Sequence, residues 1–238
     1  MKKYIHISND IKNKIIQEIY QSNEKLPSEK ELGASYEASK MTVKQALDIL
    51  VAEGLIIKRR GAGTFIKDLS SEELKRVAVT NQFRGKTSEH PQEQVTSKVF
   101  TFAVITPDQV VQNKLNITAD EFVYHIYRSR KIAEKPLVIE ETYMPISLIT
   151  GLKQSNVEHS IYDHIENTLG LVIQSVHRTI TVRPATDFET VELSLEAGQP
   201  VGVVEQVGYL STGAAFEYSV SVHRYDQFRA EVILNRGN

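Results

Sequence analysis

Arg128 and Arg130 are the side chains of this sequence best suited to hold a small anion. They fall within residues 122–132, where apolar and polar side chains alternate as they do in a β-strand. Side chains two residues apart on a strand point to the same face, so the two guanidiniums would lie together. Burying two like charges is costly unless an anion compensates them, as a phosphate or a carboxylate would. The alternative is an internal network in which the arginines pair with Glu140 and Glu217.

A second set of charged side chains lies in the first third of the chain. Residues 1–68 carry 12 basic and 9 acidic side chains, whereas residues 69–238 carry 16 basic and 21 acidic ones. The imbalance is greatest in residues 38–67, which hold 6 basic and 2 acidic side chains. A basic region joined to an acidic one favours a polyanion as the partner of the basic region. A solvated charged surface is the alternative.

Three helices are expected to position these basic side chains. The first is expected over residues 8–21, with an apolar stripe at helical spacing. The second begins at Ser28, which has a glutamate three residues later in the pattern of a capping box, and ends near Tyr36. The third begins at Ser39 and ends at Gly54. The short turn between the last two helices is typical of a helix-turn-helix, although another kind of helical hairpin is the alternative.

A basic hairpin is predicted directly after the third helix. Residues 55–60 are β-branched and then basic, Gly61-Ala62-Gly63 forms a turn, and residues 64–67 resume as a strand. Glycines allow the backbone to approach a phosphate closely, so the hairpin fits a wing that touches DNA. A plain hairpin turn is the alternative. A dinucleotide-binding loop is disfavoured because no helix follows the glycines.

The remaining chain of this 238-residue protein is expected to form a second domain. Residues 69–80 are polar and lack strong periodicity, which indicates a linker. Alternation then predicts strands over residues 95–105, 122–132, 137–143, 172–182, 201–209 and 217–225, with helices over 107–115, 160–169 and 187–195. We therefore expect an α+β fold in three parts. These are a winged helix-turn-helix over residues 1–68, a linker over 69–80, and an α+β domain with a largely antiparallel sheet over 81–238.

Several classes of function are disfavoured by what the sequence lacks. It has no cysteine, which excludes a disulfide framework and a thiol nucleophile. Its seven histidines form no ligand set, and no serine has the setting of a hydrolase nucleophile. No apolar run is long enough to cross a bilayer, and Ser8-Asn9-Asp10 interrupts any secretory signal. We expect a cytoplasmic protein that is not an enzyme, does not associate with a membrane, and has no metal and no cofactor.

Four segments of the expected first domain are similar to those of a known family. They are residues 26–32 (LPSEKEL), 39–47 (SKMTVKQAL), 53–55 (EGL) and 60–65 (RGAGTF). They resemble the winged helix-turn-helix of GntR-family transcription regulators, which implies that the third helix lies in the major groove of DNA and the hairpin in the adjacent minor groove.

The resemblance implies that positions 30, 40, 44 and 61 contact DNA. Family members usually carry arginine at the first three, where this chain has lysine. Lysine keeps the charge but lacks the bidentate fork that reads guanine, so some of these contacts would be to phosphate. The candidate DNA-binding residues are Lys30, Ser39, Lys40, Thr42, Lys44, Arg59, Arg60 and Gly61.

The expected second domain carries a resemblance of its own. Residues 127–130, 136–137, 140–145, 160–162 and 217–219 resemble the effector-binding UTRA domain of the HutC subfamily. The resemblance implies that the two arginines grip the phosphate of a phosphosugar and that the two glutamates accept hydrogen bonds from sugar hydroxyls. It further implies phosphate contacts near a helix start and a polar loop over the phosphate. The candidate effector-binding residues are Arg84, Gly85, Lys86, Thr87, Arg128, Arg130, Glu140, Ser160, Tyr162 and Glu217.

Together the two resemblances imply a homodimeric repressor of a carbohydrate uptake or catabolic operon. Its expected partners are a palindromic operator in double-stranded DNA and a small anionic effector, a sugar phosphate. One alternative is a regulator of the same family that senses an organic acid, a phosphonate or another small anion, or that acts as an activator. A lyase-like enzyme is the remote alternative, because the UTRA fold resembles that of chorismate lyase and fold alone does not decide function.

Overall fold

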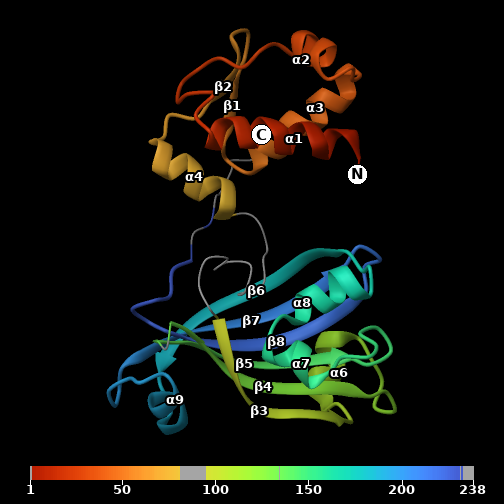
Figure 1. Cartoon of the computed structure of the whole chain (residues 1–238), viewed down its shortest axis with the longest axis vertical. Helices are drawn as coiled ribbons and strands as arrows, with labels where there is room; N and C mark the ends of the chain where they lie inside the picture. The colour runs from red at the N-terminus through yellow and green to blue at the C-terminus, as the bar shows by residue number, and fades with distance from the viewer. Residues whose placement is uncertain (1, 81–94, 134, 231, 233–238) are drawn as a thin grey trace. The chain divides into compact units, whose positions relative to one another are not determined.

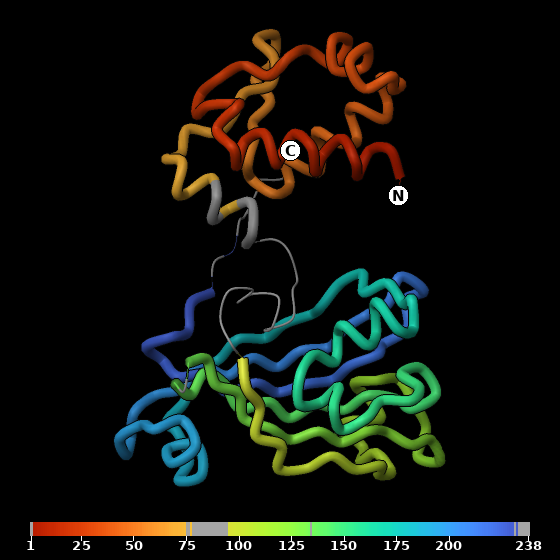
Figure 2. Tube along the Cα trace, in the orientation of Figure 1, coloured from red at the N-terminus to blue at the C-terminus, as the bar shows by residue number. Residues whose placement is uncertain are grey.

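The computed structural model describes residues 2–80, 95–133, 135–230 and 232 of the chain. The chain divides into two compact units, Met1–Gln82 and Phe83–Arg229 (Figures 1 and 2). The first unit consists of four helices and a two-stranded hairpin. They are α1 (Lys3–Ile16), α2 (Glu29–Ser35), α3 (Lys40–Ala52), β1 (Ile56–Arg59), β2 (Gly63–Ile66) and α4 (Ser71–Thr80).

The apolar stripes of these elements meet in one core. α1 contributes Ile7, Ile11 and Ile15, and α3 contributes its whole inward face. The inward residues of α3 are Val43, Ala46, Leu47 and Leu50, all of them buried. The predicted starts of the second and third helices at Ser28 and Ser39 are confirmed, because both residues are N-caps.

The first helix lies earlier than the sequence predicts. It runs over Lys3–Ile16 rather than 8–21, and Ser8, where the predicted helix begins, is buried within it. The buried stripe extends backwards to Ile7, one turn before Ile11, so the earlier register buries more apolar surface. Ile19, an apolar residue of the predicted 8–21 helix, is 58% exposed.

The predicted linker over residues 69–80 is wrong for most of its length, because residues 71–80 form α4. Ser70 and Glu73 form a capping box: the Glu73 amide donates to Ser70 Oγ at 3.2 Å, and the Ser70 amide donates to a Glu73 carboxylate oxygen at 2.9 Å. Leu74 and Val77, one helical turn apart, are buried in the core of the first unit. The helix is therefore part of this unit.

The second unit is built on a six-stranded sheet in the order β3-β4-β5-β8-β7-β6, with every neighbouring pair antiparallel. The strands are β3 (Val95–Ile105), β4 (Val123–Ile132), β5 (Lys135–Pro145), β6 (Ile173–Pro184), β7 (Pro200–Leu210) and β8 (Ala215–Arg224). The predicted fold class, α+β with a largely antiparallel sheet, is confirmed. All six predicted strands are present.

Short helices pack on both faces of this sheet (Figure 1). They are α6 (Gln109–Leu115), α7 (Gln154–Glu158), α8 (Ile161–Asp163), the π-helical turn η1 (His164–Thr168) and α9 (Asp187–Glu192). The sequence analysis did not predict α7. The predicted helix over 160–169 is present as α8 and η1 together.

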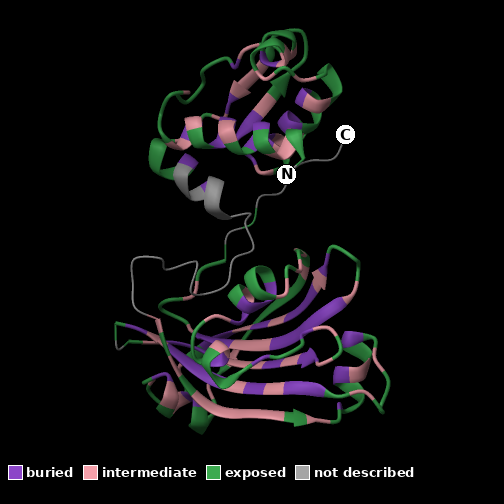
Figure 3. Ribbon diagram, turned by 45° about the vertical axis from the view of Figure 1, so that its right-hand side comes forward, coloured by how far each residue is buried: buried purple, intermediate pink, exposed green. Residues whose placement is uncertain are grey.

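The two faces of the sheet have different neighbours. One face, called here the site face, carries Ile126 and Phe216 and packs against α7, α8 and η1. The opposite face carries Val207 and Tyr218 under α6, and Val222 near α9. Figure 3 shows long buried stretches along the strands between these layers. Among the residues that the structure describes, no helix is long and apolar enough to span a membrane.

Candidate DNA-binding surface and effector site

The start of α3 is organised by its own polar side chains. Ser39 Oγ accepts a hydrogen bond from the Thr42 amide at 3.2 Å and lies 2.8 Å from Thr42 Oγ1. Lys40 and Lys44, four residues apart, are both exposed while the opposite side of the helix is buried. The helix therefore presents its two lysines on one solvent-facing surface.

The turn between α2 and α3, residues 36–39, lies close against α2 and so fixes the angle between the two helices. The amide of Ala38 donates to the Gly33 carbonyl at 2.9 Å. A Cβ added at Gly33 would lie only 3.1 Å from the Ala38 carbonyl oxygen, so a larger residue would push the turn away. Lys30 is exposed on α2, directly after the capping box formed by Ser28 and Glu31.

The hairpin β1–β2 forms the predicted wing. Gly61 and Gly63 have φ values of +75° and +118°, which glycine adopts without strain. Arg59, Arg60 and Gly61 are exposed at its tip. The guanidinium of Arg59 lies 4.5 Å from the centre of the Phe65 ring, which restricts where it can point.

Two further lysines lie at the wing. Lys58 pairs with Asp48 of α3 at 2.6 Å and so ties the wing to that helix. Lys25 pairs through its backbone with Phe65, and its side chain runs beside Gly63. Lys25 adds an exposed cation to the wing that the sequence analysis missed, because it lies 34 residues or more before the wing tip. No local pattern could have revealed this pairing.

A hydrogen-bonded group anchors the helix-turn-helix to α1. The Tyr36 hydroxyl donates to an Asp10 carboxylate oxygen at 2.6 Å, and Lys14 pairs with the same oxygen at 2.9 Å. The hydrogen bonds from Tyr36 and Lys14 lower the pKa of Asp10. Burial and the bond to Asp10 raise the pKa of Tyr36 to about 12. Tyr36 is the C-cap of α2, so this contact holds the turn that aims α3.

The predicted arginine pair lies on the site face of β4, and both side chains are buried. Arg128 donates from Nε and Nη2 to Glu140 Oε2 at 2.9 and 2.8 Å. It also donates to the carbonyl of Val157, and Arg130 donates to the carbonyl of His159 at 3.0 Å. These carbonyls lie at the C-terminal end of α7, where a helix leaves acceptors unused. The internal pairing foreseen as an alternative is thus present between Arg128 and Glu140.

Glu217 lies on the same face and is held by three donors. Tyr162 and Ser219 donate to its carboxylate from their hydroxyls, each at 2.7 Å, and Gln206 donates from Nε2 at 3.1 Å. Burial raises the pKa of Glu217, and the hydrogen bonds partly offset this by favouring the carboxylate. Burial, together with the neighbouring Glu217, raises the pKa of Tyr162.

The structure places the remaining predicted effector residues as follows. Ser160 is the N-cap of α8, and its hydroxyl accepts from the Asp163 amide at 3.2 Å. The predicted loop, Arg84, Gly85, Lys86 and Thr87, lies outside the described residues. Ser160 and Tyr162 come from the segment after α7, while Arg128, Glu140 and Glu217 come from β4, β5 and β8.

The sequence analysis missed three polar side chains that are connected to Glu217. Gln206 and Ser219 donate to Glu217 directly, and Arg178 donates to Gln206. Gln206 is only 6% exposed, and Arg178 on β6 donates from Nε to its Oε1 at 2.5 Å. A signal was available, since Gln206 interrupts the alternating apolar positions of β7 with an inward-facing amide.

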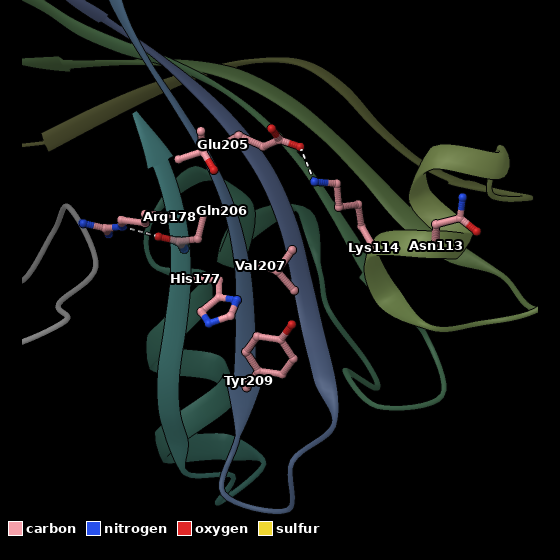
Figure 4. Close-up of a pocket in the computed structure, with 9 residues that line it drawn as sticks. Asn113, Lys114, His177, Arg178, Glu205, Gln206, Val207 and Tyr209 are labelled. Atoms are coloured by element: carbon pink, nitrogen blue, oxygen red, sulfur yellow. Dashed lines mark hydrogen bonds and ion pairs between the residues drawn. The ribbon is translucent and has the colours of Figure 1, made fainter. Parts of the chain in front are cut away.

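A hollow of about 500 Å³ lies on the opposite face of the same strands (Figure 4). It is lined by Asn113, Lys114, His177, Arg178, Thr179, Glu205, Gln206, Val207 and Tyr209. Lys114 and Glu205 pair across it at 2.7 Å, and this bond lowers the pKa of Glu205. The charges of Lys114 and Glu205 compensate each other.

Comparison with known proteins agrees with both halves of this description. The family described as bacterial regulatory proteins, gntR family, matches residues 3–66, and the UTRA domain family matches residues 92–229. The HTH-type transcriptional regulator GmuR of Bacillus subtilis is 38% identical over 96% of this chain and 96% of its own length.

Solved structures of two further Bacillus subtilis proteins are similar. The crystal structure of the possible transcriptional regulator YydK is 31% identical, covers 99% of this chain and 100% of its own, and has a TM-score of 0.75. The effector binding domain of the trehalose repressor TreR is 29% identical, covers 60% of this chain and 99% of its own, and has a TM-score of 0.53. The chain thus belongs to the GntR family of bacterial transcriptional regulators, among the members with a UTRA domain, and is a DNA-binding regulator rather than an enzyme.

Proposed function

We propose that this regulator represses an operon for the uptake or catabolism of a carbohydrate and that a sugar phosphate releases it from a palindromic operator. The buried pair Arg128 and Arg130, with carboxylates beside it, is the observation that carries the effector class. Two guanidiniums match a phosphate, whereas Glu140 and Glu217 can accept hydrogen bonds from sugar hydroxyls. The similarity to the effector domain of a trehalose repressor supports a sugar-derived effector and a repressing role.

Binding of the effector would change which group Arg128 contacts in the site. An entering phosphate competes with Glu140 for Arg128, because the carboxylate and the phosphate use the same donors. Glu140 released in this way is available to a hydroxyl group. Ser160 and Tyr162 lie on the segment that follows α7, and both arginines bind carbonyls at the end of α7. A ligand on the arginines would therefore also move or fix this segment.

The DNA-binding unit would act as one half of a homodimer in the cytoplasm. Ser39, Lys40, Thr42 and Lys44 would enter the major groove, Lys30 would reach a flanking phosphate, and the wing residues Arg59, Arg60 and Gly61 would follow the minor groove. Half-sites on a palindromic operator would be spaced by about 34 Å or a multiple of it. To change occupancy from mostly bound to mostly free, the effector must prefer the released dimer by roughly 10²–10⁴-fold, about 3–5.5 kcal/mol.

The experiment measures operator release with purified full-length protein. Fluorescence anisotropy with a labelled fragment of the adjacent promoter gives the affinity, and a panel of sugar phosphates, organic acids and phosphonates is then titrated. We expect sugar phosphates to release the DNA and to raise the melting temperature by mass action. Release by a carboxylate alone, with no response to any sugar phosphate at millimolar concentration, would contradict the proposed effector class. Tighter DNA binding with effector would contradict release.

A further inference from the structure

Met41 is an apolar side chain that stands in solvent at the start of α3. It is the second residue of the helix and is 71% exposed. The nearby polar residues Lys40, Lys44 and Gln45 are exposed as well. A single exposed apolar residue among polar ones needs no explanation by itself. What Met41 can contact therefore depends on the direction in which it leaves the helix.

The buried face of α3 shows where Met41 points. That face consists of Val43, Ala46, Leu47 and Leu50. At about 100° per residue, Met41 lies about 170° around the helix from the centre of the buried face. By the same geometry Lys44 lies about 110° and Lys40 about 70° from that centre. Met41 is thus the residue of the first turn that points most directly away from the core, and the two lysines point to one side of it.

Contacts at both ends of the helix hold this outward face in place. Ser39 Oγ accepts from the Thr42 amide at 3.2 Å and lies 2.8 Å from Thr42 Oγ1, so these two hydroxyls are engaged with each other. Asp48, two turns after Met41 on the outward side, pairs with Lys58 of the wing at 2.6 Å. The outward face therefore runs from Met41 at the helix start to the point where the wing is attached.

Thymine is the base with an apolar group in the major groove of DNA. Its C5-methyl group lies there beside an acceptor oxygen, and an apolar side chain recognises it by contact. A methionine side chain is unbranched and polarizable, so it adapts to the position of a methyl group. In a helix-turn-helix the N-terminal residues of the recognition helix lie at the base edges. With α3 in the major groove, Met41 would present its thioether and methyl group to those edges.

We propose that Met41 contacts the C5-methyl group of a thymine in each half-site of the operator and so selects an A·T pair at that position. This inference rests on the proposed function, in which α3 enters the major groove. The two lysines would hold the helix in the groove through their charge, while Met41 supplies sequence preference at one base pair.

The test removes the methyl group from the DNA and the side chain from the protein in turn. Fluorescence anisotropy gives the affinity of the full-length protein for the promoter fragment and for a series of fragments. In each of these, one symmetry-related pair of thymines is replaced by deoxyuridine, which lacks the methyl group but keeps the hydrogen bonds of the base pair. At one position wild type should lose affinity about fourfold per half-site, the value expected for burying one methyl group.

Met41→Ala should bind the unmodified fragment more weakly by a similar factor and should no longer distinguish thymine from deoxyuridine at that position. Alanine is the best helix former, so this variant keeps α3. Ile19→Ala is the matched control, because Ile19 is also an exposed apolar residue of the first unit but lies between α1 and α2. It should keep the affinity and the thymine preference of wild type.

Two outcomes would overturn the methyl contact while leaving DNA binding by the regulator intact. One is equal binding of the thymine and deoxyuridine fragments by wild type. The other is a Met41→Ala protein that loses as much affinity as wild type at every substituted position. If the protein binds no promoter fragment, the proposed function itself fails together with this inference.

Discussion

The candidate DNA-binding lysines are exposed on the first unit, whereas the two candidate effector arginines on the second unit's sheet are buried. Lys40 and Lys44 stand in solvent on a helix whose other side forms the core. Arg128 and Arg130 are buried, and Arg128 has Glu140 as a partner. Exposed cations bind a polyanion with little loss of hydration, while buried cations need a partner at all times. The affinity of the first unit for DNA should therefore depend strongly on salt concentration. The affinity of the second unit for its effector should depend mainly on the chemical groups of that ligand.

The largest effect expected from this comparison is in Arg128→Gln. Removing one member of a buried charge pair typically weakens binding by about 2–5 kcal/mol, which is roughly 30-fold or more. The effector concentration needed for release should rise accordingly, and DNA affinity without effector should stay the same. Lys131→Gln, a change on the same strand but the other face, is the control. Normal release from the Arg128→Gln protein would show that the effector binds elsewhere.

A second prediction addresses the exposed lysines. Lys40→Ala combined with Lys44→Ala should reduce the slope of log K against log salt concentration by about 2, since each lost phosphate contact contributes about 0.9. Operator affinity should fall at low salt while effector affinity remains. Lys98→Ala with Lys153→Ala removes the same charge from the second unit and should leave the slope alone. A slope unchanged by the first pair would mean that these lysines do not face DNA.

The third prediction concerns the boundary between the units. Ser70→Ala removes the N-cap of α4 and should lower the free energy of unfolding of the first unit by about 1 kcal/mol. Ser71→Ala, at the next position, is the control because Ser71 does not cap the helix. Thermal unfolding followed by circular dichroism measures both. Equal stability of the two variants would contradict the role of Ser70 as a stabilising N-cap and would favour the original interpretation of residues 69–80 as a linker.

Structural features that depend on residues close together in the sequence were the ones that the sequence could predict. Ser28, Glu31 and Ser39 act through residues three positions away, so the caps of α2 and α3 were predictable from local patterns. The capping box at Ser70 has the same pattern but was overlooked among polar neighbours. α7 spans only Gln154–Glu158, too short to show a helical period.

The effector site shows the other limit of sequence analysis. Alternation along β4 predicted that Arg128 and Arg130 share a face, but not that carbonyls at the end of α7 would receive them. The link from Gln206 to Glu217 depends on how β7 and β8 pair, and a strand pattern does not contain its partner. The resemblance to a family identified residues on four separate elements, whereas residue spacing alone identified only the arginine pair.

The smallest expected effect is the pH dependence of stability. It has opposite signs for one carboxyl group in the first unit and one in the second. Hydrogen bonds lower the pKa of Asp10 in the first unit, so its contribution to stability is present above pH 3.8 and is lost as the pH falls through the lower folded-state pKa. Burial raises the pKa of Glu217 in the second unit above 4.5. Its folded state therefore holds the proton to a higher pH than its unfolded state, and stability falls as the pH rises from about 4.5 through the raised value.

Paired variants make this difference measurable. From pH 4 to pH 7, wild type should lose stability relative to Glu217→Gln, because only wild type must ionise a buried carboxyl group. Asp10→Asn should differ from wild type by a constant amount over that range and approach it only under stronger acid. Thermal unfolding across the pH series tests both. A stability difference between wild type and Glu217→Gln that does not vary with pH would show that burial does not raise the pKa of Glu217. The contrast between a buried effector site and an exposed DNA surface would then no longer hold at Glu217.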